Sequence, residues 1–357
     1  MRRIGGPDSR EVHPSESGNH AGDKSAPLWI DWAHNLRTHT LAARLHVEVL
    51  EIRIGGSRLL RYLRSMWHTV RAIHRARPGV VIATNPSLLL GLLLLALRRW
   101  YGFALVSDAH YVGIRALRGG RLVQGVLDFH NARADLVIVT NERQAAYVTS
   151  LGGHAFVCPD PLPDLSCYAA RVPVPDKAVF LICSFERDEP FEAVFQAFAG
   201  LQQAGYTLFV SGRYARAGID PAHFPWVRFL GYVSEQDYYA YLHSCAVTVD
   251  LTELEDCLLC GAYEALAARR PLVISDTRAL RDYFGAAAVF TDNSAEKIAQ
   301  SVQHAYASRN DLTQEVSQWL ARNEEYMGER VATLLEQLRS LYEQSASGSA
   351  SSRRVLI

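Results

Sequence analysis

The chain has 357 residues, 49% of them hydrophobic and 21% charged, and its formal net charge at pH 7 is zero. This composition is ordinary for a globular protein in water, and the length favours two domains over one. The six cysteines stand at scattered spacings with no signal peptide before them. That pattern argues against a disulfide framework and predicts a reducing, cytoplasmic compartment.

The zero net charge hides two halves of opposite sign. Residues 1–157 carry 20 Lys and Arg against 11 Asp and Glu, a balance of +9, whereas residues 158–357 carry 17 against 26, a balance of −9. A basic first half predicts a surface that faces an anionic partner. A chance distribution of solvated charge is the alternative. Residues 1–26 and 345–357 are polar and rich in small residues, which predicts disorder.

Residues 27–157 alternate between strand-like and helix-like patterns. The expected strands span 28–32, 46–52, 80–84, 103–108, 135–140 and 154–158. The expected helices span 35–44, 58–76, 87–99, 119–133 and 141–151. Short apolar strands that alternate with helices predict a parallel sheet covered on both faces.

Two of these helices have unusual apolar patterns. Helix 58–76 has arginines on one face, and the apolar residues at helical spacing on the other are Leu59, Leu63, Met66, Val70 and Ile73. The run SLLLGLLLLAL at 87–97 is 11 residues long, whereas a bilayer span needs about 20. We therefore expect a helix of the core at 87–97, with shallow membrane insertion as the alternative.

A proline-rich segment separates this unit from a second alternation. Residues 158–177 contain five prolines and little periodicity, so they are expected to be an interdomain linker. Strand and helix patterns then alternate again over 178–323, and a last amphipathic helix is expected at 324–344. The predicted fold class is α/β, with two Rossmann-like, doubly wound units that face a cleft. Ligands of such sheets bind at the carboxyl ends of the strands.

The second unit carries the motifs of a known family. Its run VRFLGYVSEQDYYAYLHSCAVTVDLTELEDCLLCGAYEALAARRPLVISDT has an acidic residue, Asp256, with seven residues between it and Glu264, inside a Glu-Ala-Leu-Ala helix that leads to a proline-led strand. This pattern resembles the donor-binding domain of GT-B glycosyltransferases of the retaining family 4 type, in which the motif is Glu-x7-Glu. The resemblance covers about residues 28–343 and is most specific over 178–285. It implies an acceptor-binding first unit and a donor-binding second unit.

The resemblance also implies roles for the motif residues. Asp256 would accept hydrogen bonds from the donor sugar, and Glu264 would hold vicinal ribose hydroxyls, as a carboxylate can. The helix start at Cys260, Gly261 and Ala262 would present free amides to the diphosphate, with Gly261 allowing a close approach. A capping acid and a surface glutamate are the alternative interpretation of the two carboxylates.

The loop that follows the first strand of the second unit departs from the family pattern. Family members usually place an Arg and a Lys there, whereas this chain has SFERDEP. Ser184, Arg187 and the more distant Arg213 are therefore the expected donor contacts. Asp256 is itself a departure, since its side chain is one methylene shorter than the usual glutamate. Neutralising the leaving phosphate is a large term in such chemistry, so the cation that does it matters.

In the first unit, the resemblance points to His110, which follows a strand in SDAHYVG and would face the donor sugar or the acceptor. Arg37 and Asn85 stand on loops that open to the same cleft, and Arg115 adds to a basic surface that suits an anionic lipid or a lipid-diphosphate acceptor. These three are the expected acceptor contacts. Each has a structural or solvated alternative.

Other chemistries find little support. The Cys257-x-x-Cys260 pair lacks a second pair at metal spacing, so two small buried side chains explain it better than zinc or redox chemistry. No Walker loop, G-x-G-x-x-G, H-E-x-x-H or G-x-S-x-G motif is present. We expect no cofactor and no catalytic metal.

Together these features predict a retaining glycosyltransferase with a nucleoside diphosphate sugar as donor and a hydroxyl acceptor. The acceptor is expected to be a lipid-linked surface glycan, which places the protein in the cytoplasm or peripherally at the inner membrane face. Two alternatives stay open: a non-catalytic GT-B homologue that acts as a binding or scaffolding subunit, and a sugar-nucleotide 2-epimerase on the same two-domain plan.

Overall fold

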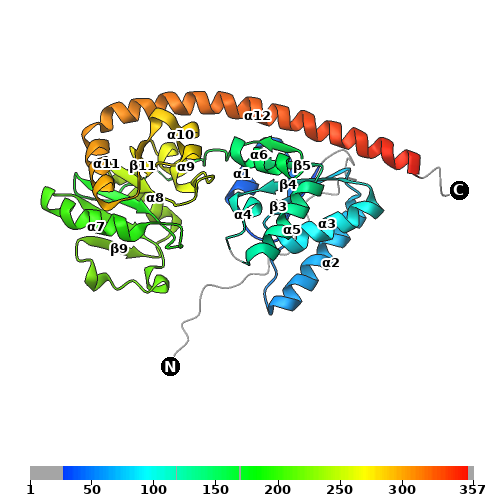
Figure 1. The fold of residues 1–357 in the computed structure, drawn as a ribbon, viewed down its shortest axis with the longest axis horizontal. Coiled ribbons are helices and arrows are strands. Elements are labelled where there is room, and N and C mark those ends of the chain that lie inside the picture. The colour runs from blue at the N-terminus through cyan, green and yellow to red at the C-terminus, as the bar shows by residue number, and fades with distance from the viewer. Residues whose placement is uncertain (1–26, 118, 169, 353–357) are drawn as a thin grey trace.

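The computed structural model describes residues 27–117, 119–168 and 170–352. Over these residues the chain forms two separate six-stranded sheets, each wholly parallel, with helices on both faces (Figure 1). The predicted fold class is confirmed. Residues 1–26, for which the sequence predicts disorder, lie outside the described residues.

The first sheet has the strand order β2-β1-β3-β4-β5-β6. Its strands are β1 (Leu28–Asp31), β2 (Glu48–Glu51), β3 (Val80–Asn85), β4 (Ala104–Ala109), β5 (Leu136–Val139) and β6 (Ala155–Val157). The helices of this unit are α1 (Leu36–Leu45), α2 (Arg58–Ala76), α3 (Leu88–Tyr101), α4 (Tyr111–Ile114), α5 (Gly120–Arg133) and α6 (Glu142–Ser150). The strand order reverses between β1 and β3, so a crevice is expected at their carboxyl ends.

The second sheet has the order β12-β11-β10-β7-β8-β9. Its strands are β7 (Ala178–Ile182), β8 (Thr207–Ser211), β9 (Val227–Gly231), β10 (Val247–Asp250), β11 (Leu272–Ser275) and β12 (Val289–Thr291). Its helices are α7 (Phe191–Leu201), α8 (Glu235–Ser244), α9 (Cys260–Ala267), α10 (Arg278–Phe284), α11 (Ala295–Ala307) and α12 (Arg309–Ser352), with short 3-10 turns η1 (Gln202–Ala204), η2 (Tyr214–Ala217), η3 (Pro221–His223) and η4 (Gly285–Ala287). Here the order reverses between β7 and β10.

The central strands of each sheet, such as β3, β5, β10 and β11, are buried along their whole length, whereas no residue of the edge strand β2 is fully buried. In the first unit, Leu41 of α1 packs on one face, and Ile73 of α2 with Leu94 of α3 packs on the other. In the second unit, Leu266 of α9 and Phe198 of α7 lie on opposite faces. Two independent hydrophobic cores result.

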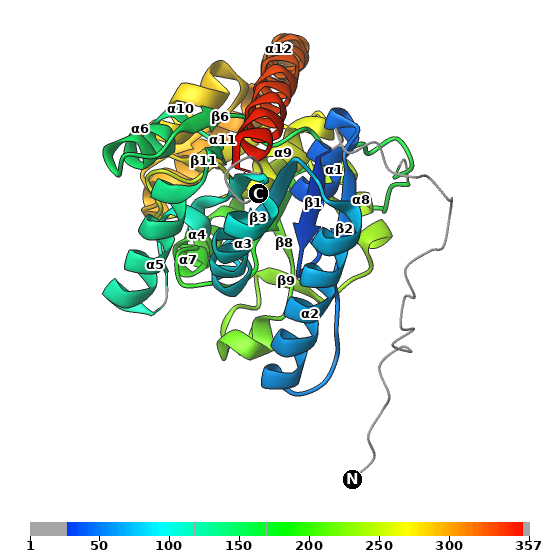
Figure 2. The same cartoon turned by 90° about the vertical axis from the view of Figure 1, so that its right-hand side faces the viewer.

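Helix α12 joins the two units. Its Trp319 is buried in the core of the second unit, whereas Met327 and Leu334 are buried in that of the first. Arg330 Nε also donates to the backbone oxygen of Val157 at 2.7 Å. Figure 1 shows the helix running along both units, and Figure 2 shows it above the strands of the first.

Helix α12 differs from what the sequence predicts for the carboxyl-terminal part of the chain. The sequence predicts a separate helix at 324–344 and a disordered tail from 345, but α12 is continuous from 309 and extends through Ser352. Residues 353–357 lie outside the described part of the chain. The expected linker, 158–177, contains no helix or strand among its described residues. The short helices α4 and α10 were not expected, because neither is long enough to give a periodic pattern.

Candidate functional site

The loop after β7 is organised around one carboxylate. Glu189 accepts hydrogen bonds from the Ser184 amide at 3.0 Å, the Ser184 hydroxyl at 3.0 Å and the Glu186 amide at 2.7 Å. An anion therefore already lies against the backbone amides at this strand end, and Ser184 is engaged with it. Arg187, in the same loop, is exposed, and no hydrogen bond or ion pair joins it to another described residue. Its guanidinium is available to a ligand.

Glu264 is held on α9 by the neighbouring helix α8. The Tyr238 hydroxyl donates to Glu264 Oε2 at 2.6 Å. Burial raises the pKa of Glu264, although hydrogen bonds from Tyr238 and Tyr239 act in the opposite direction. The residue is half-buried on a helix that begins at the end of the β10 loop. The result is a carboxylate with a fixed position beside the switch point of the second sheet.

The role expected for Gly261 is corrected by its packing. A Cβ there would lie 2.5 Å from Asp250 Oδ2 and 2.6 Å from Ile182 Cγ2. The glycine thus lets α9 pack on β7 and β10. Ala262 is fully buried in the core, and its amide, expected to be free for a diphosphate, donates to the Leu259 oxygen at 3.2 Å.

Asp250 is an unusual group at the end of β10. Its carboxyl is buried, and Oδ2 has no hydrogen-bond partner. Burial raises the pKa of Asp250 well above its ordinary value, the charges of Glu189 and Glu264 raise it further, and a backbone hydrogen bond from Ala262 opposes them. This environment favours the protonated form of the Asp250 carboxyl.

Asp256 connects the two units. Its carboxylate pairs with Arg143 of α6, and its backbone oxygen accepts from Asn141 Nδ2 at 2.9 Å and Gln144 Nε2 at 2.8 Å. The structure therefore gives this side chain a protein partner where the resemblance implies a donor sugar. Because α6 belongs to the first unit, the contact holds the motif loop against that unit.

His110 follows β4 in the first unit, across from the Asp256 loop of the second unit. Its Nε2 is 3.2 Å from Asn35 Nδ2 and 3.9 Å from Asp108 Oδ2, and the ring is partly exposed. The adjacent Tyr111 has a raised pKa, first because of burial and then because of the nearby charges of Cys257 and Asp256. The structure thus brings the His110 turn and the Asp256 loop together.

Arg37 and Asn85, expected to contact an acceptor, are corrected. Arg37 is buried, with Nε 3.0 Å from Asp108 Oδ1 and Nη2 2.9 Å from the oxygen of Cys158, and it also pairs with Asp160. Asn85 is buried as well, and its amide donates to the Gly113 oxygen and to Asn131 Oδ1 at 3.2 Å. Both side chains are engaged by protein partners, which argues against the expected acceptor contacts.

Solved structures share this architecture. HepE from Anabaena, in complex with UDP and glucose, superposes with a TM-score of 0.62 at 12% identity, covering 91% of this chain and 99% of HepE. Sucrose-phosphate synthase from Thermosynechococcus elongatus gives 0.66 at 16% identity, covering 92% and 100%. UDP-GlcNAc 2-epimerase from Methanocaldococcus jannaschii gives 0.52 at 11% identity, covering 78% and 92%. The chain has the GT-B fold. No protein-family model and no curated protein matches the sequence.

The remaining expected contacts, Arg213, Arg115 and Cys260, differ in their exposure and in their partners. Arg213 is exposed at the end of β8, with its Cζ 4.7 Å from the centre of the Tyr232 ring. Arg115 is half-buried and stacks on Tyr147 at 3.7 Å. Cys260 is exposed and Cys257 is half-buried, so the expectation that both cysteines of the C-x-x-C pair are buried is wrong.

The sequence did not predict four residues of the candidate site described above: Tyr238, Asp250, Glu189 and Arg143. Asp250 carried a usable signal, because an ionisable side chain stands at the end of an otherwise apolar strand, VTVD. Tyr238 gave none, since a tyrosine on an amphipathic helix is unremarkable. Glu189 and Arg143 act through contacts that sequence spacing does not encode.

Proposed function

We propose that this GT-B protein is a retaining glycosyltransferase that moves a sugar from a nucleoside diphosphate donor to a hydroxyl acceptor, with no metal ion at the diphosphate. The proposal rests above all on Glu264, a carboxylate held by Tyr238 at the strand switch point of the second unit. Vicinal ribose hydroxyls are the natural donors to such a group. UDP and UDP-glucose bound to HepE, which has the same fold, make a UDP-sugar the first donor to test.

Arg187 is the cation assigned to the leaving diphosphate. Its exposed side chain stands on the loop after β7. In the same loop, Asp188 Oδ2 accepts a hydrogen bond at 3.3 Å from the hydroxyl of Thr252, which follows β10. A guanidinium offers a phosphate two parallel hydrogen bonds and a permanent charge. The leaving phosphate would then take the proton of the incoming hydroxyl, with His110 positioned to orient one of the sugars.

UDP is expected to raise the melting temperature of the wild-type protein, because a ligand that binds only the native state stabilises it by mass action.

Arg187→Ala should weaken UDP binding by about tenfold to a hundredfold, since a hydrogen bond to a charged group contributes about 1.5–3 kcal/mol. Titration calorimetry measures the affinity. Arg228→Ala, an exposed arginine within strand β9, is the matched control. Equal affinity in all three proteins would remove Arg187 from the site.

Product analysis separates this function from its rivals. Transfer or slow hydrolysis of a UDP-sugar by the purified protein supports a glycosyltransferase. Donor binding without any turnover supports a non-catalytic subunit, which the pairing of Asp256 with Arg143 favours because that carboxylate then has no free role at the sugar. Interconversion of two UDP-sugars with no acceptor present supports an epimerase.

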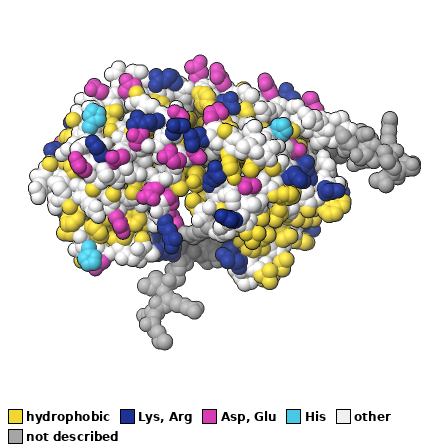
Figure 3. All heavy atoms as spheres, in the orientation of Figure 1, with side chains coloured by type: hydrophobic (Ala, Val, Ile, Leu, Met, Phe, Trp, Pro, Cys, Tyr) yellow, Lys and Arg dark blue, Asp and Glu magenta, His cyan; other side chains and the backbone are white. Residues whose placement is uncertain are grey.

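An exposed apolar surface on the first unit supports a lipid-linked acceptor. Of the 12 large hydrophobic side chains exposed among the described residues, ten lie between 59 and 129. They are Leu59, Leu60, Leu63, Trp67, Leu89, Leu92, Trp100, Leu117, Leu122 and Phe129, and we call them the apolar face. Helices α2, α3 and α5, which carry most of them, contact one another in that order. Figure 3 shows hydrophobic atoms gathered where Figure 1 has these helices.

The packing of α2 explains how this face arises. The sequence places Leu59 and Leu63 on the same apolar face of this helix as Ile73, but they are 72% and 55% exposed, and the buried positions of α2 are Ser65, Thr69 and Ile73. Between residues 54 and 133 the chain has 12 arginines and only two acids. Exposed leucine and tryptophan beside arginine suit shallow insertion into an anionic bilayer. No described helix is long and apolar enough to span a membrane.

We expect the protein to sediment with vesicles that contain phosphatidylglycerol and to bind neutral phosphatidylcholine vesicles more weakly. The double change Leu63→Ser with Trp67→Ser should reduce binding at least about tenfold, since each inserted large apolar side chain contributes about 1.5–3 kcal/mol. The control, Tyr232→Ser, alters an exposed aromatic side chain of the second unit. Equal sedimentation of both variants would exclude the apolar face as the membrane contact.

A further inference from the structure

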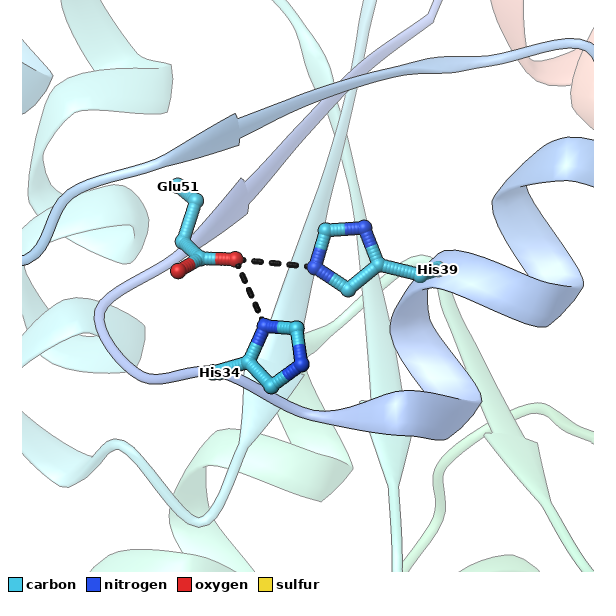
Figure 4. A group of neighbouring side chains, drawn as sticks. All are labelled: His34, His39 and Glu51. Atoms are coloured by element: carbon cyan, nitrogen blue, oxygen red, sulfur yellow. Dashed lines mark hydrogen bonds and ion pairs between the residues drawn. The ribbon is translucent and has the colours of Figure 1, made fainter. Parts of the chain in front are cut away.

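Three potential metal ligands gather at one edge of the first sheet, outside the donor site. His34 lies on the loop after β1, His39 in the first turns of α1, and Glu51 at the carboxyl end of β2. Figure 4 shows both imidazole rings turned toward the same carboxylate. Strands β1 and β2 are adjacent and parallel, with Asp31 paired to Glu51, so the sheet itself brings the three side chains together.

The ligand atoms converge on one point. His34 Nδ1 is 3.0 Å and His39 Nε2 is 2.8 Å from Glu51 Oε2, and the three atoms all lie within 4.8 Å of one another. The other carboxylate oxygen, Oε1, is 3.3 Å from Arg53 Nη1. That ion pair orients the carboxylate and leaves Oε2 facing the rings.

The same atoms can exchange a proton for a metal ion. An ionised carboxylate has no hydrogen to give, so in these contacts each ring nitrogen carries the hydrogen. The neutral tautomer with its hydrogen on the opposite nitrogen presents a lone pair from the same position. Burial alone would raise the pKa of Glu51, but hydrogen bonds from His34 and His39 lower it. Two imidazoles and one carboxylate form a ligand set that zinc accepts.

We propose that His34, His39 and Glu51 bind one Zn²⁺ ion with three protein ligands and one open position. Three-ligand zinc sites keep that fourth position for water or for an oxygen of a bound molecule. His34 is followed by Asn35, whose Nδ2 is 3.2 Å from His110 Nε2. Asn35 thus links the three-residue cluster to the His110 turn, and an anionic oxygen of a ligand in the first unit would be a natural fourth partner for the ion.

Zinc content of the full-length protein tests this directly. After equilibration with ZnCl₂ and gel filtration, we expect one zinc ion per chain for the wild type and for His304→Ala, which removes an exposed histidine of α11. His34→Ala and Glu51→Gln should each lose the ion.

Cobalt substitution adds a readout of ligand geometry. Co²⁺ in a four-coordinate site with nitrogen and oxygen ligands has intense visible absorption, which His39→Ala should abolish while its circular dichroism stays native. Absence of zinc from the wild type, or equal zinc in wild type, His34→Ala and Glu51→Gln, would overturn the proposal. None of these measurements uses a sugar donor, so their outcome is independent of the glycosyltransferase assignment.

Discussion

Glu264→Gln is expected to lower kcat/KM for a UDP-sugar by about a hundredfold to a thousandfold while the fold survives. The carboxylate would accept two hydrogen bonds from the ribose, each contributing about 1.5–3 kcal/mol when the acceptor is charged. Glutamine has the same shape but presents a neutral oxygen and an amide that repels a hydroxyl donor. A loss of about 1.4 kcal/mol is tenfold in rate, which sets the size of the effect.

The structure gives this experiment a clear control. Tyr238 donates to Glu264 and can still donate to the glutamine oxygen, so α8 and α9 keep their contact. Glu325→Gln, an exposed glutamate on α12, should leave both activity and melting temperature unchanged. Initial-rate kinetics with UDP-glucose, together with thermal melts of all three proteins, measures the effect. Wild-type kcat/KM in Glu264→Gln would contradict the assignment of α9 as the donor helix.

The fold could be predicted from the sequence because local patterns encode it. Each expected strand of the first unit overlaps a strand of the structure, and the expected helix 58–76 matches α2 at both ends. Apolar runs of four or five residues between helices leave a parallel sheet as the only way to bury both faces. The continuous α12 was missed although Leu312, Val316 and Trp319 recur at helical spacing in its first turns and are buried.

The site could be predicted only as far as it depends on chain order. Chain order places His110 after β4, the 183–190 loop after β7 and Glu264 on the helix after β10, all at the carboxyl ends of parallel strands. Contacts between units are not written in spacing, so the pairing of Asp256 with Arg143 was not foreseeable. Solvent exposure was also invisible: the apolar positions of α2 have the period of a core helix, yet Leu59 and Leu63 face outward because no element covers them.

Arg37 has a stability role that its position in the first turn of α1 conceals. Its side chain is 2% exposed, and that of its partner Asp108 is fully buried. Burial alone would lower the pKa of Arg37, but the charges of Asp108 and Asp160 raise it above its ordinary value. The guanidinium joins the end of β4 to the first residues of the linker, since it also donates to the oxygen of Cys158.

Arg37→Met is therefore expected to lower the free energy of unfolding by about 3–5 kcal/mol, because it leaves the Asp108 carboxylate buried without its charge partner. Arg44→Met is the matched control: Arg44 also lies on α1 and pairs with Glu324 at 2.9 Å, but the two side chains are 31% and 61% exposed, so about 0–1 kcal/mol is expected. Urea unfolding of both variants measures the difference. If Arg37→Met proved as stable as Arg44→Met and lost only acceptor binding, Arg37 would be a ligand contact after all, and the buried pair would contribute nothing to stability.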